Sequence, residues 1–166
     1  MSLDGCIATS GGESQWITGP ASRAHGHRER ARADAILVGG GTLRADNPRL
    51  DVRLSGLEGR SPKRIALTSG EVPEGWQAIR SPNDIATLDG VRYLMVEGGA
   101  QTASAFLKAG LVDRLLVYRA PVLLGGGTPA IGNIGHDTLE AAFADGLVLQ
   151  DRRTLGSDTL EVYQRG

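Results

Sequence analysis

The segment Ala35-Ile36-Leu37-Val38-Gly39-Gly40-Gly41-Thr42 decides the fold class of this chain. Its first four residues form a continuous apolar run, which is typical of a strand covered on both faces within a parallel sheet. Two further runs have the same form, because residues 64–68 end in Ser69-Gly70 and residues 93–96 end in Glu97-Gly98-Gly99. The repeated arrangement predicts an α/β fold with a mainly parallel central sheet and helices on both faces.

Two helices are predicted around these strands. The pattern of residues 20–33 predicts a helix with a proline in its first turn and with Thr18 or Gly19 near its cap. Residues 102–109 form a second helical pattern, and Gly110 stops it as a candidate left-handed cap.

The last third of the chain favours antiparallel structure. Residues 115–118 form a fourth apolar strand pattern, and a second glycine triplet follows at residues 125–127. Residues 147–153 and 159–163 alternate in polarity around Gly156-Ser157-Asp158, which predicts a C-terminal β-hairpin at an antiparallel edge.

The composition indicates one soluble domain over residues 1–166, with 40% hydrophobic and 22% charged residues. A formal net charge of −1 shows no basic excess for a nucleic-acid partner. No apolar run approaches the ~20 residues of a membrane span, and no signal peptide is visible. The single Cys6 excludes an intramolecular disulfide and a multi-cysteine zinc site, and it is interpreted as a packed thiol. These observations predict a cytoplasmic protein without a metal ion.

Glycine makes up 24 of the 166 residues, about twice its average frequency, and it gathers at strand ends. The run at residues 39–42 could cradle a pyrophosphate with its N–H groups, or it could be a turn that needs positive φ. Residues 97–102 repeat the order of strand, glycines and helix start. Two such ends favour a nucleotide in a groove over the strands that finish at Val38 and Val96, although the full G-x-G-x-x-G fingerprint is absent.

Several charged residues are candidates for an anion site. Arg23, His27 and Arg30 share one face of the predicted helix, which is either a solvated basic face or an anion site fed by Arg30. Arg53 could pair with a phosphate or carboxylate as a fork, or lie in a solvated loop. Glu97 is either an acid or ligand acceptor, or a carboxylate stabilised by a helix dipole.

Several stretches together resemble one family. They are Ser2-Leu3-Asp4-Gly5 with Ile7-Ala8-Thr9; Gly12-Glu13-Ser14-Gln15-Trp16-Ile17-Thr18; Gly41-Thr42 with Ala45-Asp46-Asn47-Pro48-Arg49-Leu50 and Val52-Arg53; Val96-Glu97-Gly98-Gly99; Gly110-Leu111-Val112-Asp113-Arg114; and residues 121–126. Over nearly the whole chain, this set is similar to the C-terminal reductase domain of the bifunctional riboflavin-biosynthesis deaminase/reductase. The resemblance implies the fold of dihydrofolate reductase.

The resemblance also implies an activity, the NADPH-dependent reduction of 5-amino-6-(5-phosphoribosylamino)uracil, whose ribose becomes a ribityl chain. It implies that the substrate contacts fall on Ser14, Arg30, Leu50, Arg53 and Glu97. It implies that the cofactor contacts fall on Trp16, Thr42, Asp46, Ser69 and the loop of residues 99–105, which includes Gly99, Ala100, Gln101, Thr102 and Ala103. The glycine-ended strands add Gly41 and Gly98 to the cofactor side.

Three features depart from the family's pattern. The family's first strand begins several residues upstream of residues 2–5, so the first strand is expected to be truncated here. Cys6 stands where the family usually has a basic residue, and the short stretch between Ser69 and Tyr93 affects the adenosine end of the cofactor site. The zinc signature of the deaminase domain is also missing, so a separate deaminase is expected to act upstream.

The favoured hypothesis is a reductase in which hydride passes from NADPH to C1′ of the ribose through an opened, imine-like form. Asp46 and Glu97 are the nearest ionisable candidates for catalysis, and solvent could serve instead. The alternatives are a reductase of another pteridine- or pyrimidine-like substrate on the same fold, and a non-catalytic nucleotide-binding module. The retained charged residues favour the enzyme.

Two further expectations concern the cofactor and the assembly. The resemblance favours NADPH over NADH, because no acidic residue follows Leu67 where an acceptor for a ribose 2′-hydroxyl would be expected. Ser69, with Thr68 and the nearby Arg64, could receive a 2′-phosphate. A homodimer is expected because the family commonly pairs through its C-terminal half, where this chain has apolar stretches.

Overall fold

The structure is a computed structural model that describes residues 1–144 and 146–166. Its backbone contacts group the chain into two compact units, one of residues 24–109 and one of residues 1–23 with 110–166. The expectation of a single domain over residues 1–166 stays a prediction. Among the described residues, every helix is too short or too polar to span a bilayer.

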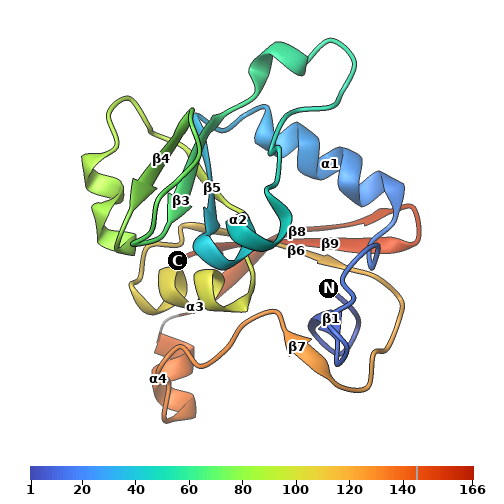
Figure 1. Ribbon diagram of the computed structural model, residues 1–166. Coiled ribbons are helices and arrows are strands. Elements are labelled where there is room, and N and C mark those ends of the chain that lie inside the picture. Colours follow the sequence, from blue (N-terminus) through green and yellow to red (C-terminus); the bar gives the residue numbers. More distant parts are fainter. Residues whose placement is uncertain (145) are drawn as a thin grey trace. The chain divides into compact units, whose positions relative to one another are not determined.

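The unit of residues 24–109 is built on a four-stranded parallel sheet with the strand order β4-β3-β2-β5 (Figure 1). Its strands are β2 (Ala35–Gly39), β3 (Lys63–Leu67), β4 (Trp76–Ile79) and β5 (Leu94–Val96). Ala35 lies opposite Lys63 on one side and opposite Leu94 on the other. The three apolar runs are therefore neighbouring parallel strands, as the sequence predicts.

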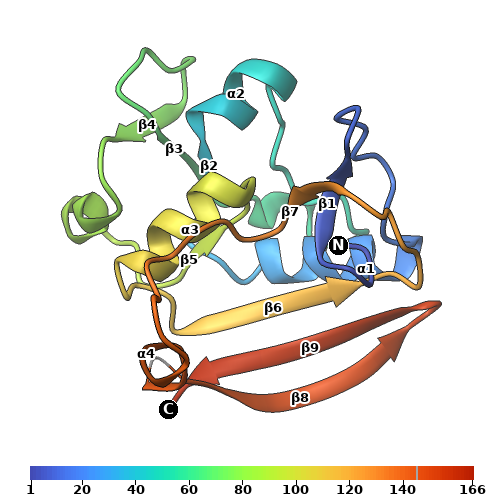
Figure 2. The same cartoon turned by 90° about the horizontal axis from the view of Figure 1, so that it is seen from below.

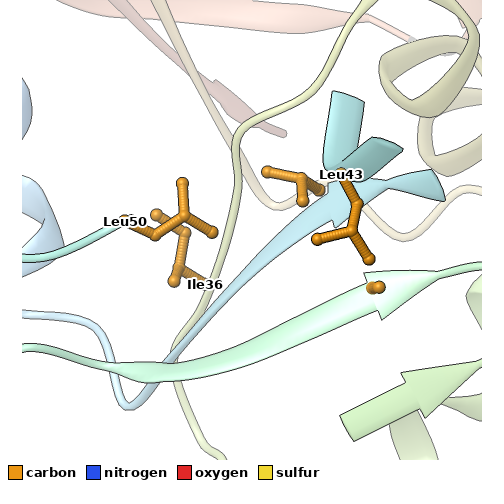
Figure 3. Close-up of a cluster of buried hydrophobic side chains, with 5 residues drawn as sticks. Ile36, Leu43 and Leu50 are labelled. Carbon is orange, nitrogen blue, oxygen red and sulfur yellow. The ribbon is translucent and has the colours of Figure 1, made fainter. Parts of the chain in front are cut away.

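The core of this unit lies against β2, all of whose residues are buried. Ile36 of β2 packs with Leu43 and Leu50 (Figure 3). Leu43 comes from α2 (Gly40–Asp46), and Leu50 comes from the loop that follows this helix. Because both faces of β2 are covered, the strand needs no polar face, which explains its unbroken apolar sequence.

The helices differ from their predictions mainly at the ends. Helix α1 (Pro20–Arg30) begins at the predicted proline and ends before residue 33. Helix α3 (Ala100–Lys108) begins earlier than predicted, and Gly110 adopts the expected left-handed conformation with φ of 68°. The short 3-10 helices η1 (Glu58–Arg60) and η2 (Pro82–Thr87) lie in the connections between strands.

The glycines at the strand ends allow side chains to approach the backbone closely. The φ of Gly39 is −73° and α2 begins at the next residue, so the interpretation as a turn with positive φ is wrong. A Cβ on Gly39 would overlap Oγ1 of Thr102, and a Cβ on Gly98 would lie 2.8 Å from Cβ of Thr102. A Cβ on Gly40 would lie 2.7 Å from Oγ1 of Thr68. The glycines therefore make room for α3 and for the end of β3.

The other unit is built on antiparallel pairs. Its larger sheet has the strand order β6-β9-β8 (Figure 2). The strands are β6 (Arg114–Arg119), β8 (Leu147–Leu155) and β9 (Asp158–Arg165). The predicted C-terminal hairpin is the β8–β9 pair, and the predicted strand at residues 115–118 pairs with β9 in this separate antiparallel sheet. The remaining elements are β1 (Cys6–Thr9), which pairs with β7 (Gly127–Pro129), and α4 (Leu139–Ala144).

Asp4 joins the start of the chain to the second glycine triplet. Its carboxylate accepts hydrogen bonds from Ser2 Oγ at 2.5 Å and from the N–H of Gly125 at 2.8 Å. These bonds, with that from Ser2 the strongest influence, lower the pKa of Asp4 to about 2. Cys6 is 8% exposed, which confirms its interpretation as a packed thiol.

Asp158 supplies the cap of α1 from the start of β9. Its Oδ2 accepts hydrogen bonds from the N–H of Gly19 at 2.7 Å and from Ser22 Oγ at 2.6 Å. Burial alone would raise the pKa of Asp158, but the bonds from Ser22, Gly19 and Ser157 outweigh it and hold the pKa below its ordinary value. The predicted cap at Gly19 is thus completed by a residue far away in the sequence.

Replacing Asp158 with alanine should lower the free energy of unfolding by about 3 kcal/mol, because three donors lose a charged acceptor. The pKa of Asp158 is lowered in the folded state. Its contribution is therefore present above the unfolded pKa of about 4, and it is lost as the pH falls through the folded pKa. Denaturant unfolding at acidic and neutral pH measures both effects. The exposed Asp137→Ala is the control, and equal stability of the two variants at neutral pH would contradict the assignment.

Gly39→Ala should destabilise the protein by about 2 kcal/mol, because its methyl group would overlap Thr102. The loss should be smaller in a Thr102→Ala background, where the overlapping oxygen is gone. Gly41→Ala is the matched control, since a Cβ there would meet no atom within 4 Å and should be neutral or slightly stabilising in the helix. Thermal unfolding of the four variants measures the coupling, and strictly additive losses would count against the close approach.

Candidate functional site

The carboxyl ends of β2 and β5 lie side by side, because the two strands are parallel neighbours. The N–H of Glu97 donates to the carbonyl of Leu37 at 2.8 Å, so the pairing continues to the last residue before the glycines. Gly41 and Gly99 therefore follow the same edge of the sheet. This arrangement is the one on which the predicted groove depends, and the groove itself stays a prediction.

The predicted cofactor residues of this unit gather at the same edge. Gly41, Thr42 and Asp46 lie on α2, Ser69 follows β3, and residues 98–103 comprise the two glycines before α3 and its first turn. Asp46 and Ser69 are exposed, whereas Thr102 is buried beneath two glycines and packs within the unit. The cofactor contacts expected of this segment stay predictions, and the sequence gave no sign that Thr102 faces inward.

The start of α3 offers a backbone cradle. A Cβ on Gly99 would meet no atom within 4 Å, so the chain is open there. The first N–H groups of a helix, here those of Ala100 and Gln101, have no acceptor within the helix, and this end carries partial positive charge. Open backbone and N–H groups of this kind fit a phosphate-bearing cofactor.

Ser14 and Trp16 belong to the other unit. Ser14 is exposed. The Trp16 side chain is 69% exposed, and the guanidinium carbon of Arg23 lies 4.7 Å from the centre of its ring. Arg23 also donates to the carbonyl of Thr18 at 2.7 Å, so it is not simply a solvated charge. The ligand contacts expected of Ser14 and Trp16 stay predictions.

Arg30 and Glu97 form a bidentate ion pair. Arg30 Nε donates to Glu97 Oε1 at 2.7 Å, and Nη2 donates to Oε2 at 2.6 Å. Burial would lower the pKa of Arg30, but the hydrogen bonds and the charge of Glu97 outweigh it and raise the pKa. The sequence marked both residues, one as a basic helix position and one beside glycines. Their pairing connects the end of α1 to the end of β5.

Asp51 is a residue that sequence reasoning missed. Its carbonyl oxygen accepts a hydrogen bond from Arg30 Nη1 at 3.2 Å and lies 3.1 Å from Nδ1 of His27. Its carboxylate forms ion pairs with Arg49 at 2.9 Å and with Nε of Arg53 at 3.3 Å. A contact through a main-chain carbonyl leaves no mark in the sequence, which explains the omission.

Leu50 and Arg53 flank this residue in different ways. Leu50 is 5% exposed and has φ of 51°, a left-handed conformation that is unusual for a bulky side chain. The Arg53 side chain is 62% exposed, so its guanidinium is accessible. The backbone turns sharply at the buried Leu50 and then presents Arg53 to solvent.

His27 lies among these charges. Its pKa is lowered, first by burial and then by the positive charges of Arg30 and Arg53. The ring is therefore neutral at physiological pH. The predicted basic face of α1 is in this part a hydrogen-bonded cluster rather than a solvated surface. Within the described residues, no group of three His, Cys, Asp or Glu side chains could hold a metal ion.

A cavity of about 440 Å³ is lined by residues near the starts of β3 and β4, and also by Arg49, Leu50 and Asp51 of the loop that follows α2. Its lining includes Lys63 and Arg64 at the start of β3 and Gly75 just before β4. The guanidinium carbon of Arg64 lies 5.5 Å from the ring centre of Trp76, at the first residue of β4. The expectation that Arg64 joins Ser69 at a 2′-phosphate is therefore wrong, because an extended strand separates the two residues.

The chain has relatives among known proteins. The model of the RibD C-terminal domain family matches residues 1–88 and 83–159. The riboflavin biosynthesis protein RibD of Mycobacterium tuberculosis strain H37Rv is 38% identical over 158 residues, which cover 85% of this chain and 46% of that protein. The chain thus spans about half the length of the curated relatives it matches.

Solved structures show the same fold. RibD of Acinetobacter baumannii, form 1, superposes with a TM-score of 0.83 at 27% identity, over 99% of this chain and 56% of that one. A protein of Thermotoga maritima, described as a diaminohydroxyphosphoribosylaminopyrimidine deaminase/5-amino-6-(5-phosphoribosylamino)uracil reductase, has a TM-score of 0.78 at 23% identity, over 99% of this chain and 54% of that one, and shares the fold. The predicted α/β fold class, like that of dihydrofolate reductase, is confirmed. The chain belongs to the RibD C-terminal domain family, as the resemblance of its motifs predicts.

Proposed function

We propose that this chain is an NADPH-dependent reductase of 5-amino-6-(5-phosphoribosylamino)uracil, acting in riboflavin biosynthesis in the cytoplasm. The observation that carries the proposal is the cluster around Asp51, where Arg30, Glu97 and Arg53 come together. Family membership gives this cluster its context. We call the part of the site that holds Arg30 and Arg53 the cationic end. A module that only bound a nucleotide would not need it.

The cationic end suits a ribose phosphate. Three donors of Arg30 are occupied by Glu97 and the carbonyl of Asp51. Arg53 keeps an exposed guanidinium, whose fork matches the oxygens of a phosphate better than an ammonium group would. In this proposal Arg53 binds the phosphate, while Arg30 and Glu97 shape the wall beside it and offer polar atoms to the sugar.

The cofactor end fits the glycine-ended strands. Open backbone at Gly41 and Gly99, with the first N–H groups of α3, would hold the phosphates of NADPH. NADPH, when bound, supplies the hydride that reduces the ribose carbon. Glu97 accepts two hydrogen bonds from Arg30, which suits it to orient the substrate rather than to donate a proton. Asp46, exposed on α2, stays the candidate proton donor.

A deaminase must act on the pyrimidine before this step, so we propose a deaminase as the upstream partner.

The function is tested by measuring the oxidation of NADPH by the purified chain. The nicotinamide absorbance is monitored with 5-amino-6-(5-phosphoribosylamino)uracil present and absent. Turnover that depends on this pyrimidine, and faster turnover with NADPH than with NADH, is expected. Turnover with another pteridine or pyrimidine only, or nucleotide binding without turnover, would contradict the proposal.

Arg53→Ala should raise the KM of the pyrimidine by roughly tenfold to a hundredfold, because a charge-assisted contact with the phosphate is lost. The KM of NADPH should barely change, and the exposed position should leave the protein folded. Steady-state kinetics with each substrate varied in turn measures both constants. Arg60→Ala, another exposed arginine of the same unit, is the control, and a rise in the KM of NADPH alone would contradict the assignment.

We also propose that the protein is a homodimer. Leu139 and Phe143 on α4 are 78% and 80% exposed, and Val148 and Leu149 on the edge strand β8 are 50% and 48% exposed. A second copy of the chain would cover such apolar side chains and the open edge. Light scattering at micromolar concentration should give twice the 17.4 kDa of one chain. Phe143→Ser should lower this mass, Leu123→Ser should leave it unchanged, and a monomeric wild type would refute the proposal.

A further inference from the structure

His27 contacts the backbone on which the cationic end is built. It lies on α1 one turn before Arg30. Its Nδ1 is 3.1 Å from the carbonyl oxygen of Asp51 and 3.3 Å from the backbone nitrogen of Arg53. One ring nitrogen thus reaches both ends of the three-residue segment that leads to the exposed guanidinium.

The two contacts need different states of the ring. A proton on Nδ1 allows donation to the carbonyl of Asp51, whereas a bare Nδ1 allows acceptance from the N–H of Arg53. Each neutral tautomer therefore makes one hydrogen bond to the segment. Both tautomers tie the same piece of backbone to α1.

The segment needs such a restraint. Leu50, just before it, holds the left-handed conformation with φ of 51°, which is strained for a residue with a side chain. The buried Leu50 side chain fixes one end of the strained turn. Beyond Leu50, the carbonyl of Asp51 is bonded to Arg30, and the N–H of Val52 donates to Ser61 Oγ at 3.0 Å. His27 adds the contact that reaches Arg53.

The charge of the ring suits this place. Two guanidinium groups, of Arg30 and Arg53, and two carboxylates, of Glu97 and Asp51, surround it. Burial and the two guanidinium groups keep the imidazole neutral, so it makes hydrogen bonds without adding a third positive charge. A lysine or arginine in its place would put a third positive charge beside the two guanidinium groups.

We infer that His27 is a positioning residue that fixes the backbone of residues 51–53, so that the guanidinium of Arg53 meets the phosphate of the substrate. The inference rests on the proposed function and assigns His27 no contact with the substrate. The inference explains how an exposed arginine in a loop can form a defined anion site, because hydrogen bonds to His27 hold this loop against α1.

The kinetic test uses three substitutions at His27 and one control. His27→Ala and His27→Phe remove both hydrogen bonds and should raise the KM of the pyrimidine about tenfold, with kcat and the KM of NADPH within about twofold of wild type. His27→Asn places a donor and an acceptor near the position of Nδ1 and should restore most of the loss. His25→Ala, on the same helix with its ring 3.9 Å from Glu29, should leave the KM unchanged.

Several outcomes would overturn the inference. These are an unchanged KM in His27→Phe, an equal rise in the KM of both substrates, and a failure of His27→Asn to restore binding while its thermal stability is that of wild type. Should His27→Ala not fold, the Phe and Asn pair decides, because Phe fills the space of the ring and only Asn restores its polar atoms.

A second measurement separates this inference from the proposed function. Ribose 5-phosphate is titrated into each variant by calorimetry, with no cofactor and no turnover. His27→Phe should bind it about tenfold more weakly than wild type, and hydrogen exchange should be faster in residues 50–54. If the wild type fails to oxidise NADPH but this difference remains, only the proposed function fails. Equal binding by both proteins, or binding by neither, overturns the role of His27.

Discussion

The ion pair between Arg30 and Glu97 is the constraint on which the site depends. The two side chains are 17% and 28% exposed, so each charge is partly removed from water and relies on the other. Two nitrogens of the Arg30 guanidinium donate to the two carboxylate oxygens of Glu97, a paired geometry that only arginine can provide. Through the third nitrogen of Arg30, the same guanidinium also reaches the backbone of Asp51. A helix, a strand end and a loop are thus held by one planar group.

The two arginines of this arrangement, Arg30 and Arg53, differ in what their guanidinium groups contact. Arg30 has its donors directed at protein groups, and its charge is balanced by a carboxylate. Arg53 lies farther out, and its ion pair with Asp51 is longer, at 3.3 Å, so an incoming anion can compete for it. The Arg30–Glu97 pair fixes the shape of the site, and the exposed guanidinium of Arg53 can attract an anion. For the proposed phosphate contact, an arrangement that keeps its form before the ligand arrives reduces the ordering that binding requires.

The sequence predicts the parts whose causes are local. Unbroken apolar runs mark β2, β3 and β5, Gly110 marks a helix end, and alternation marks the β8–β9 hairpin. It does not predict what depends on contacts between distant residues. Gly39 is needed because Thr102 packs against it, and the cap of α1 is supplied by Asp158. Arg64 contacts the ring of Trp76 rather than lying near Ser69. The candidate site shows the same limit: Arg30, Arg53 and Glu97 were named, whereas Asp51 acts through its carbonyl and left no signal.

The division of the chain has a consequence for the order of folding. All four strands of the parallel sheet lie within the continuous stretch of residues 24–109, so every strand of this sheet has its pairing partner once that stretch has left the ribosome. The other unit joins residues 1–23 to residues 110–166, and the bond from Gly125 to Asp4 spans 121 positions. Closing so long a loop is slow and costs entropy, so the first residues must wait for the last ones. During synthesis, residues 24–109 can therefore be structured before residues 1–23 have paired with residues 110–166.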